Sequence, residues 1–483
     1  MTQKKGNNGD YQNMLSASKS QKGKKEGFSS RIGFVLAAAG SAVGLGNIWR
    51  FPYLAAKYGG GIFLLTYLVL MLTFGYALLI SENCIGRMTG CSPIGAFRKL
   101  CTGKKFGKWI NPGGWINALV PMLILPYYCV IGGWVTKYTA AFFWEPVANF
   151  QEETFSASYF TDFISSTWEP IIFFAVFILI TALVVCFGVE KGIERCSKIL
   201  MPSLILLIVG ICVYCLFLPG AKNGLIYYLK PDFAKFSYMT VVEAMGQLFF
   251  SLSIAMGIMI TYGSYMRKED DLVSSVNHVE LFDTAVSFLA GLMIIPAVVA
   301  FGGEEAAGNA GPGLIFVVMP QVFASFTGGQ IVGALFFVLV LFAAATSAVS
   351  LLETNVHTLM QELKIPRIRA LIYCISEVLI IGITTVLGYS VFKFVHPLKF
   401  IDKFKGMDIL DTLDFISNSV LMPIGAIYTT LLVIAAVGLN KICSEIKSAG
   451  KPWRREFVYR FCMVVIVIPC LLIVLLNATG LLH

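Results

Sequence analysis

Long apolar segments recur along the 483-residue chain, and runs such as Leu204 to Leu218 do not alternate polar and apolar residues as barrel strands would. A helix needs roughly 20 apolar residues to cross the hydrocarbon core of a bilayer, and about eleven segments meet this length. They lie near residues 32–57, 61–85, 113–144, 168–188, 197–218, 240–265, 280–301, 328–360, 370–391, 412–437 and 457–478. The pattern predicts an all-α membrane protein with about eleven transmembrane helices.

The first apolar segment contains a stretch that a simple spanning helix would not need. It reads Gly40-Ser41-Ala42-Val43-Gly44-Leu45-Gly46-Asn47, followed by Ile48-Trp49-Arg50-Phe51-Pro52. Each glycine costs a helix roughly 1 kcal/mol relative to alanine, and Asn47 and Arg50 bring polar groups to membrane depth. Glycines alone would favour a close helix contact in a bundle. The added polar groups favour an unwound segment, whose carbonyls bind a cation and whose half-helix amino end binds an anion.

The sixth apolar segment is interrupted in a similar way. It carries a run of small and hydroxyl residues, Gln247-Leu248-Phe249-Phe250-Ser251-Leu252-Ser253-Ile254-Ala255-Met256-Gly257. Broken first and sixth helices are typical of transporters built from two five-helix inverted repeats. We therefore expect a tail at 1–30, a first repeat at 31–220 (helices 1–5), a second repeat at 240–437 (helices 6–10) and one extra helix at 456–480.

Composition and charge agree with a membrane protein and indicate its direction. Hydrophobic residues make up 57% of the chain, above the roughly 45–50% of soluble domains. The net charge of +9 could suggest nucleic acid, but the basic residues recur in every second loop, which indicates topology and no nucleic-acid partner. We expect a multi-pass protein of the cell inner (plasma) membrane, with a cytoplasmic amino terminus and the carboxyl terminus outside. Two lysine-rich segments, 222–235 and 393–405, run against the rule and are placed outside despite their charge.

The remaining motifs argue against enzymes and organic cofactors. The twelve cysteines are scattered and lack the paired spacing of a zinc site. No signal peptide precedes the first segment, and no phosphate-binding loop of the Gly-x-x-x-x-Gly-Lys-Ser/Thr type is present. The four histidines form no His-Glu-x-x-His pattern, and no serine has the flanking glycines of a hydrolase.

Several motifs together resemble the neurotransmitter:sodium symporter family, in its bacterial amino-acid-transporting, leucine transporter-like branch. The most specific is Gly40 to Pro52. Further matches are Tyr127-Tyr128, the Ser251 region, Ala343 to Ser347 and Asp411 to Phe415, so the resemblance covers nearly the whole chain.

The resemblance implies two sodium sites. The first would use Ala42, Asn47, Ser251 and Asp283, and the second Gly40, Val43, Ala343, Thr346 and Ser347. Hard cations prefer several oxygen ligands, which both sets supply. Hydroxyls in membrane helices more often bond back to the preceding turn, and by itself the sequence favours that interpretation for Thr346 and Ser347.

The resemblance also implies an amino-acid site beside the first sodium. The substrate would contact Ala42, Leu45, Gly46, Ile124, Tyr128, Phe250, Ser251, Ser253, Met256 and Leu351, with Ala255 and Ala348 shaping the pocket. The amides of Leu45 and Gly46 and the Tyr128 hydroxyl would bind a carboxylate at a half-helix amino end, although a membrane tyrosine is more often an interfacial aromatic. Gly44 replaces the aspartate of monoamine-transporting relatives, which favours a zwitterionic substrate. Because the pocket residues are small or apolar, a neutral, hydrophobic amino acid is expected, although core packing would explain any one of them equally well.

Gates and anion dependence follow from the same resemblance. Arg50 and Asp414 would form an outer ion pair above an aromatic lid of Tyr128 and Phe250. The inner gate would pair Lys25 with Gln361, more weakly than in relatives, or Glu362 would substitute. In animal members a chloride lies near the positions that match Tyr67, Gln247, Ser251, Asp283 and Ser287. We expect Asp283 to supply the negative charge itself, so that transport is independent of chloride.

The sequence thus predicts a sodium-coupled symporter that imports a neutral amino acid by alternating access, with the substrate, sodium and the lipid bilayer as partners. Two alternatives remain: a transporter of the same fold that uses protons or carries another solute, and a non-transporting amino-acid receptor or intramembrane enzyme.

Overall fold

The computed structural model describes residues 27–144, 157–309, 313–325, 328–398 and 405–479, and over these residues the chain folds into helices without a named strand. The first half contains α2 (Arg31–Ala42), η1 (Gly46–Arg50), α3 (Phe51–Lys57), α4 (Gly61–Leu70), η2 (Met71–Gly75), α5 (Tyr76–Thr89), α6 (Pro93–Cys101), α7 (Gly107–Ile110), α8 (Pro112–Trp144), α9 (Ala157–Ser165), α10 (Trp168–Cys186), η4 (Val189–Glu194), α11 (Arg195–Leu216), α12 (Ala221–Leu229) and η5 (Phe233–Lys235). The second half contains α13 (Tyr238–Ser251), α14 (Ile258–Ser264), α15 (Leu272–Asn309), η6 (Leu314–Val318), α16 (Met319–Ala324), α17 (Gly329–Leu363), α18 (Arg367–Leu387), α19 (Ile409–Asp414), η8 (Phe415–Leu421), α20 (Met422–Leu431), η9 (Leu432–Val437), α21 (Leu439–Ile446), η10 (Lys447–Ala449), α22 (Glu456–Phe461), η11 (Cys462–Ile466) and α23 (Val467–Thr479).

Both broken segments begin at side-chain caps that the sequence supplies. The Ser30 hydroxyl accepts a hydrogen bond from the Gly33 amide at 3.0 Å and starts α2. Ser237 and Thr240 form a reciprocal capping box at the start of α13. Such caps satisfy amide groups that the first turn of a helix leaves without partners. The positions at which both segments start are therefore set locally.

The prediction of a helical membrane protein is confirmed, but the count of eleven spans is not. Within the described residues, nine helices are long and apolar enough to cross a membrane, and a tenth span forms if α2 is joined to η1 and α3 across a bend of 49°. The predicted sixth span occurs as α13 and α14, separated by the non-helical residues 252–257. Each of its two helices is too short to cross alone, because a span needs roughly 20 residues.

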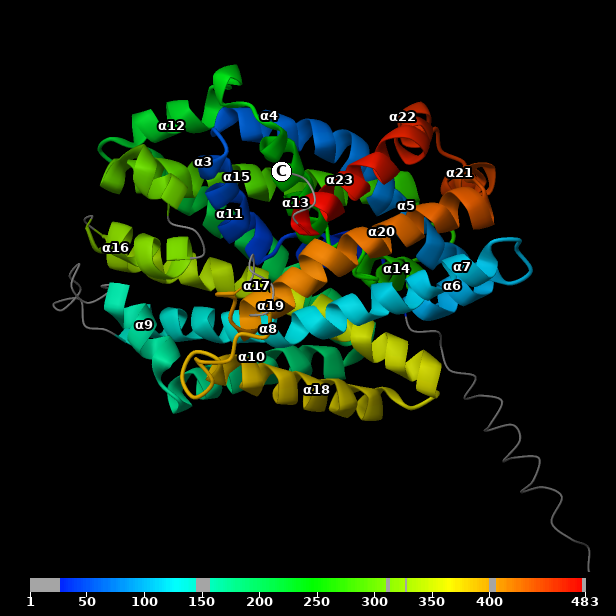
Figure 1. Cartoon of the computed structure of the whole chain (residues 1–483), viewed down its shortest axis with the longest axis horizontal. Coiled ribbons are helices and arrows are strands. Elements are labelled where there is room, and N and C mark those ends of the chain that lie inside the picture. Colours follow the sequence, from blue (N-terminus) through cyan, green and yellow to red (C-terminus); the bar gives the residue numbers. More distant parts are fainter. Residues whose placement is uncertain (1–26, 145–156, 310–312, 326–327, 399–404, 480–483) are drawn as a thin grey trace, which may run out of the picture.

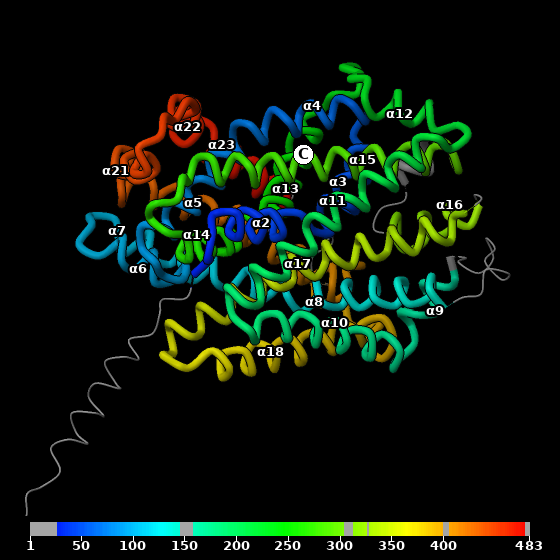
Figure 2. The backbone as a smooth tube through the Cα atoms, turned by 180° about the vertical axis from the view of Figure 1, so that it is seen from behind, coloured from blue at the N-terminus to red at the C-terminus, as the bar shows by residue number. Residues whose placement is uncertain are grey.

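The helices run broadly along the long axis of the molecule, and shorter helices mark its two ends. Figures 1 and 2 both place α9, α12 and α16 at one end and α6, α7, α21 and α22 at the other. The first described residues lie at the end that carries α6 and α14, because the Phe28 amide bonds to the Tyr265 carbonyl just after α14. We call this the inner end and the α12 end the outer end, following the predicted topology.

The core lies where the broken helices meet the long helices α8, α15 and α17. Nearly the whole α2–α3 region is buried, including Phe34, Val43 and Phe51. By contrast, the peripheral helices α10 and α18 expose large aliphatic side chains such as Leu179, Leu183 and Ile380. Lipid is as apolar as these side chains, so they need no protein cover. The described residues test neither the division into repeats at 31–220 and 240–437 nor its inverted symmetry, and both stay predictions.

Candidate binding site at the two broken helices

A small cavity lies between the two broken helices. It is lined by residues of α2 and η1, α8, α13 and the break after it, α14 and α17: Ser41, Ala42, Gly44, Leu45, Gly46, Ile124, Tyr128, Phe250, Ser253, Met256, Ile258, Ser347 and Leu351. Every residue predicted to contact the substrate lines this cavity except Ser251, which is turned toward Asp283. Residues from five parts of the chain therefore meet where the sequence expected them to meet.

One side of the cavity is polar because the first span is interrupted at Val43 and Gly44. The Leu45 amide lies 3.4 Å from the Tyr128 hydroxyl, and the Gly44 amide donates to Asn47 Oδ1 at 3.0 Å. A Cβ at Gly44 would lie only 2.4 Å from the Ser347 hydroxyl oxygen. A side chain at residue 44 would force Ser347 to move, and with glycine there the backbone amides and the Tyr128 hydroxyl form this polar side.

Another part of the cavity lining is apolar. Ile124, Met256, Ile258 and Leu351 are all buried, and the described residues that line the cavity include no charged side chain. A charged ligand group facing this wall would remain without a partner, which is costly in a low-dielectric site. The wall therefore suits an uncharged, apolar group.

Beside the cavity, Asn47 and Asp283 join η1 to α15 in a fully buried polar network. Asn47 Nδ2 donates to Asp283 Oδ1 at 2.7 Å and to the Ser287 hydroxyl at 2.8 Å. The other carboxylate oxygen, Asp283 Oδ2, accepts from the Tyr67 hydroxyl at 2.9 Å and the Ser251 hydroxyl at 3.3 Å. In the described part of the chain, no arginine or lysine pairs with Asp283. A buried carboxylate that is bonded only to neutral donors has no positive partner, and a bound cation would supply one.

The network contains three of the four residues predicted for the first sodium site, and Ala42 lines the adjoining cavity. Four of the five positions that match the chloride region, Tyr67, Ser251, Asp283 and Ser287, also belong to it. The fifth, Gln247, bonds next to it: its Nε2 donates to the carbonyl of Gly46, which precedes Asn47, at 2.8 Å. Gln247 therefore supports the end of the first break.

The residues predicted for the second sodium site meet between α2 and α17. The Ser347 hydroxyl reaches across to the Ser41 carbonyl at 3.1 Å, and a Cβ at Gly40 would lie 3.3 Å from Thr346 Cβ. The Thr346 hydroxyl instead bonds within its own helix, to the Phe342 and Ala343 carbonyls at 3.1 Å. Thr346 thus has the back-bonded arrangement common for membrane hydroxyls. Ion binding by this set stays a prediction, as it does for Val43.

The break in the sixth span has an unusual backbone. Ser253 and Ala255 have positive φ angles of 53° and 60°, which cost a non-glycine residue on the order of 1–3 kcal/mol each. Two contacts hold this conformation: the Ala255 amide donates to Glu82 Oε1 at 2.8 Å, and the Ser253 hydroxyl donates to the Ser41 carbonyl at 3.0 Å. Glu82 lies on α5 and is completely buried. The contacts of the sixth break thus reach both α5 and the first break.

Within the described residues Arg50 and Asp414 form no ion pair with each other, and the predicted outer gate stays a prediction. Arg50 instead lies 4.0 Å from Glu243 on α13 and 5.9 Å from the Phe250 ring centroid. Asp414 accepts hydrogen bonds from the Tyr127 hydroxyl at 3.1 Å and from Asn418 Nδ2 at 2.5 Å. Arg50 thus has its partners on α13, and Asp414 has one on α8 and one a single turn further along its own helical segment.

The predicted inner gate is only partly described, because Lys25 lies outside the described residues. Gln361 Oε1 accepts from the Ser92 amide at 2.7 Å, and its Nε2 lies 2.8 Å from His357 Nε2. Glu362, the alternative acid, pairs with Arg98 at 2.5 Å. Both residues therefore tie the end of α17 to α6.

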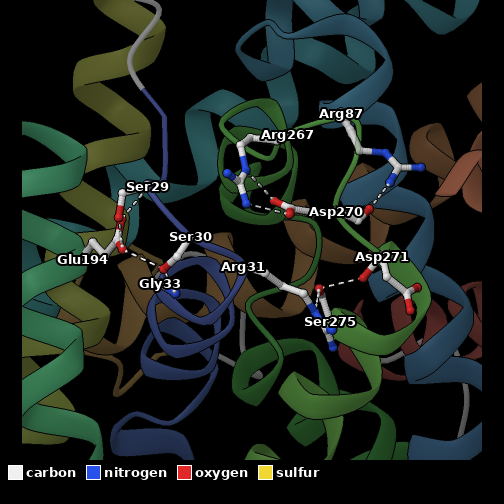
Figure 3. A network of polar contacts seen from close by, with 10 residues as sticks. All are labelled: Ser29, Ser30, Arg31, Gly33, Arg87, Glu194, Arg267, Asp270, Asp271 and Ser275. Atoms are coloured by element: carbon white, nitrogen blue, oxygen red, sulfur yellow. Dashed lines mark hydrogen bonds and ion pairs between the residues drawn. The ribbon is translucent and has the colours of Figure 1, made fainter.

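A separate polar network fastens the start of α2 at the inner end. Figure 3 shows Ser29 and Ser30 directed at Glu194, and Arg31 directed at Ser275. The Ser29 hydroxyl and Glu194 Oε1 are 2.6 Å apart. Nearby, Arg267 pairs with Asp270, whose carbonyl accepts from Arg87 at 3.0 Å (Figure 3). In this structure the inner end of the first span is thus bonded to η4 and α15.

Comparison with known proteins identifies the family of this chain. The sequence profile of the sodium:neurotransmitter symporter family matches residues 25–154 and 145–481. The chain belongs to this family. The sodium-dependent transporter YhdH of Bacillus subtilis is 34% identical over 456 residues, which cover 94% of this chain and 98% of the relative. A sodium-dependent transporter of Haemophilus influenzae is 32% identical over 418 residues, or 85% of this chain and 89% of the relative.

A solved structure agrees with the assignment. The crystal structure of MhsT in complex with L-phenylalanine matches with a TM-score of 0.82 and 37% sequence identity, and it covers 94% of this chain and 99% of the other. Together with the family, this likeness makes the chain a multi-pass, sodium-dependent membrane transporter, and not an enzyme. The predicted family and fold class are confirmed.

Within this symporter fold, the sequence analysis missed three supports of the site. Glu82 holds the second break, Glu243 attracts Arg50, and Tyr127 is buried and bonds to Asp414. An acidic residue inside the apolar segment 61–85 was the available signal for Glu82, because a carboxylate at membrane depth needs a partner. The partner itself depends on how α5 packs against the break.

Proposed function

We propose that this symporter imports a neutral, hydrophobic amino acid together with sodium. The observation that carries the proposal is the two-sided cavity: a polar side formed by the Leu45 amide and the Tyr128 hydroxyl, and an apolar wall that includes Ile124, Met256 and Leu351. An α-amino acid has the matching division into a charged backbone and a side chain. The phenylalanine bound by MhsT, a structural relative, supports the same substrate class.

The proposed mechanism begins with the two breaks. The substrate carboxylate binds near the Leu45 and Gly46 amides, at the amino end of the half-helix that starts at η1, where the helix dipole favours an anion. The ammonium group faces the carbonyls of Ala42, Phe250 and Ser251. The substrate side chain packs against the apolar lining and displaces water from it.

Sodium would bind at two places next to this cavity. The first set is Ala42, Asn47, Ser251 and Asp283, beside the substrate carboxylate, and the second is Gly40, Val43, Ala343, Thr346 and Ser347. Each sodium ion that enters with the substrate contributes about 2.3 kcal/mol per 100 mV of membrane potential, in addition to its concentration gradient. This gradient drives accumulation of the amino acid as the site opens alternately to each side of the membrane.

Uptake by purified protein in proteoliposomes tests the proposal. A panel of labelled neutral, acidic and basic amino acids is supplied under an inward sodium gradient, and a parallel set replaces sodium with choline. We expect sodium-dependent uptake of apolar members only. Uptake of acidic or basic members, or equal uptake in choline, would contradict the assignment, and uptake driven by a pH gradient instead would favour proton coupling.

A paired measurement tests the role of Asp283. With gluconate in place of chloride, uptake should be unchanged, because the buried carboxylate already supplies the negative charge. Tyr128→Phe offers a matched test of the polar side, since it removes only the hydroxyl near the Leu45 amide. We expect a higher KM for the substrate, by roughly 10-fold for one lost hydrogen bond to a charged group.

A further inference from the structure

Three lysines that oppose the predicted topology gather at the outer end of the molecule. Lys222 and Lys230 lie on and just after α12, and Lys235 ends η5. All three are exposed. Basic residues are normally concentrated on the cytoplasmic side, so an outer cluster requires a local reason.

Two of these lysines line an open pocket of about 600 Å³ between α12, η5 and the outer part of α15. Its polar lining includes Lys230, Lys235, Asn223 and Tyr227. Lys235 Nζ lies 4.8 Å from the centroid of the Tyr227 ring, so the ammonium group is directed over the pocket wall. The pocket therefore presents two cations and two neutral polar side chains to one space.

The positive charge of this pocket is not neutralised within the described structure. Neither Lys230 nor Lys235 forms an ion pair with a described carboxylate. The acid in the lining, Asp232, accepts a hydrogen bond from the Ala234 amide at 3.0 Å and caps η5. A pocket with two unpaired lysines and one engaged carboxylate is suited to an anion.

Large apolar side chains surround the same lysines. Phe233 is 71% exposed, Tyr238 59%, Phe236 50%, Ile226 48% and Leu229 43%. A water-soluble anion gains nothing from such a surface, whereas a lipid offers a charged headgroup and acyl chains together. Aromatic residues and lysines with apolar stems are typical of the membrane interface. Charge and exposed apolar surface therefore point to the same ligand.

We propose that this pocket binds the phosphate of an anionic phospholipid and that its occupancy alters the rate of transport. Lys230 and Lys235 meet the phosphate, Asn223 offers a hydrogen bond, and the acyl chains lie along Ile226 and Leu229. Basic pockets beside membrane helices recognise anionic headgroups in this way. The site lies at the opposite end of the first span from the inner network at Glu194.

The pocket is connected directly to α3, the outer half of the first span. The Tyr227 hydroxyl donates to the Ala56 carbonyl on α3 at 2.6 Å, and an isolated bridge pairs Gly60 with Pro231. Gly59, which follows α3, lines the pocket itself. Helix α3 continues from η1, which borders the substrate cavity, so a lipid that fixes α12 also restrains this half-helix. Only this effect on transport rests on the proposed function.

Native mass spectrometry of delipidated protein in detergent tests binding without any transport. Phosphatidylglycerol is titrated into wild type, K230Q/K235Q, K230R/K235R and the control K104Q/K105Q, whose exposed lysines lie in the loop between α6 and α7. We expect K230Q/K235Q to weaken the tightest lipid binding by roughly 10- to 30-fold, because each lysine near a phosphate contributes about one factor of five. The arginine variant and the control should match wild type, and phosphatidylcholine should not bind tightly to any variant.

Two results would overturn the lipid site. One is equal phosphatidylglycerol affinity in wild type and K230Q/K235Q. The other is displacement of the bound lipid by glycerol 3-phosphate, which would identify a site for soluble anions.

Uptake in proteoliposomes tests the effect on transport. Adding phosphatidylglycerol to phosphatidylcholine vesicles should change the initial rate of wild type and the control at least twofold, and should leave K230Q/K235Q unchanged. The same response in K230Q/K235Q would overturn the coupling. If no variant transports any amino acid, the proposed function fails, while the mass spectra still decide the lipid site.

Discussion

The break in the first span and the break in the sixth span are held open in different ways. The first is short, at Val43 and Gly44, and its polar groups are met by side chains on other helices, including Tyr128, Gln247 and Ser347. The sixth break covers residues 252–257 and contains two non-glycine residues with positive φ. The first break therefore depends on many weak partners, and the second on strained backbone fixed by a buried carboxylate.

The two breaks also differ in the parts of the molecule that they contact. The contacts of the first break and its flanking residues reach α8, α13, α15 and α17. The sixth break depends on Glu82 and on Ser41, which lies on α2 just before the first break. Movement of the first break would therefore be transmitted to the second through one pair of serines.

Removing the Asn47 side chain should have the largest effect on the first break. In Asn47→Ala, Asp283 and Ser287 lose their shared donor and the Gly44 amide loses its acceptor. Each buried group that is left without its partner costs about 1–3 kcal/mol, so uptake should fall roughly 100-fold or more. Initial uptake rates measure this. Ser287→Ala, which removes only one acceptor of Asn47, is the matched control and should lose far less.

Removing the Glu82 side chain should affect the sixth break less. Glu82→Ala leaves the Ala255 amide buried without an acceptor, at a cost of about 1–3 kcal/mol, so we expect roughly 10-fold slower uptake and a lower Tm in detergent. Glu82→Gln retains an acceptor oxygen and should stay close to wild type. If Gln is as damaging as Ala, the charge of Glu82 and not its hydrogen bond supports the break.

Thr346→Val separates ion binding from helix packing beside the first break. If the Thr346 hydroxyl only bonds back to Phe342 and Ala343, its loss should leave the sodium dependence of uptake unchanged. The proposed second sodium site predicts instead a roughly 5-fold higher sodium concentration at half-maximal uptake, from about 1 kcal/mol of lost coordination. Sodium titrations of uptake decide between these two outcomes. Thr354→Val is the control, because the Thr354 hydroxyl also bonds to the preceding turn of α17 and lies further along the helix.

Ala255→Gly should have the smallest effect and the opposite sign. Glycine adopts the φ of 60° at this position without strain, so the folded state should gain on the order of 1 kcal/mol. Thermal unfolding in detergent should show a slightly higher Tm. A lower Tm would mean that Ala255 is not strained and that the Glu82 contact alone defines the break.

The positions of most spans and of both interruptions could be predicted because they depend on local composition. Apolar segment length sets the spans, and the glycines with Asn47 mark the first break. The residues predicted to contact the substrate line one cavity, apart from Ser251, but Ala255 and Ala348, which were expected to shape the pocket, are not in its lining. The partners of long polar side chains were harder to predict, because several partners lie within reach: Arg50 lies beside Glu243, and Gln247 donates to the Gly46 carbonyl.

By itself, the sequence determined the helical membrane architecture, because this follows from the length and composition of its apolar segments. The family and most residues that line the cavity were predicted from the resemblance of its motifs to known symporters. Only the tertiary structure decided which polar groups are paired. Glu82 meets Ala255 across 173 positions, and Tyr227 meets Ala56 across 171. Such pairs depend on the packing of whole helices, since each buried donor or acceptor bonds to whatever partner the packed bundle brings within reach.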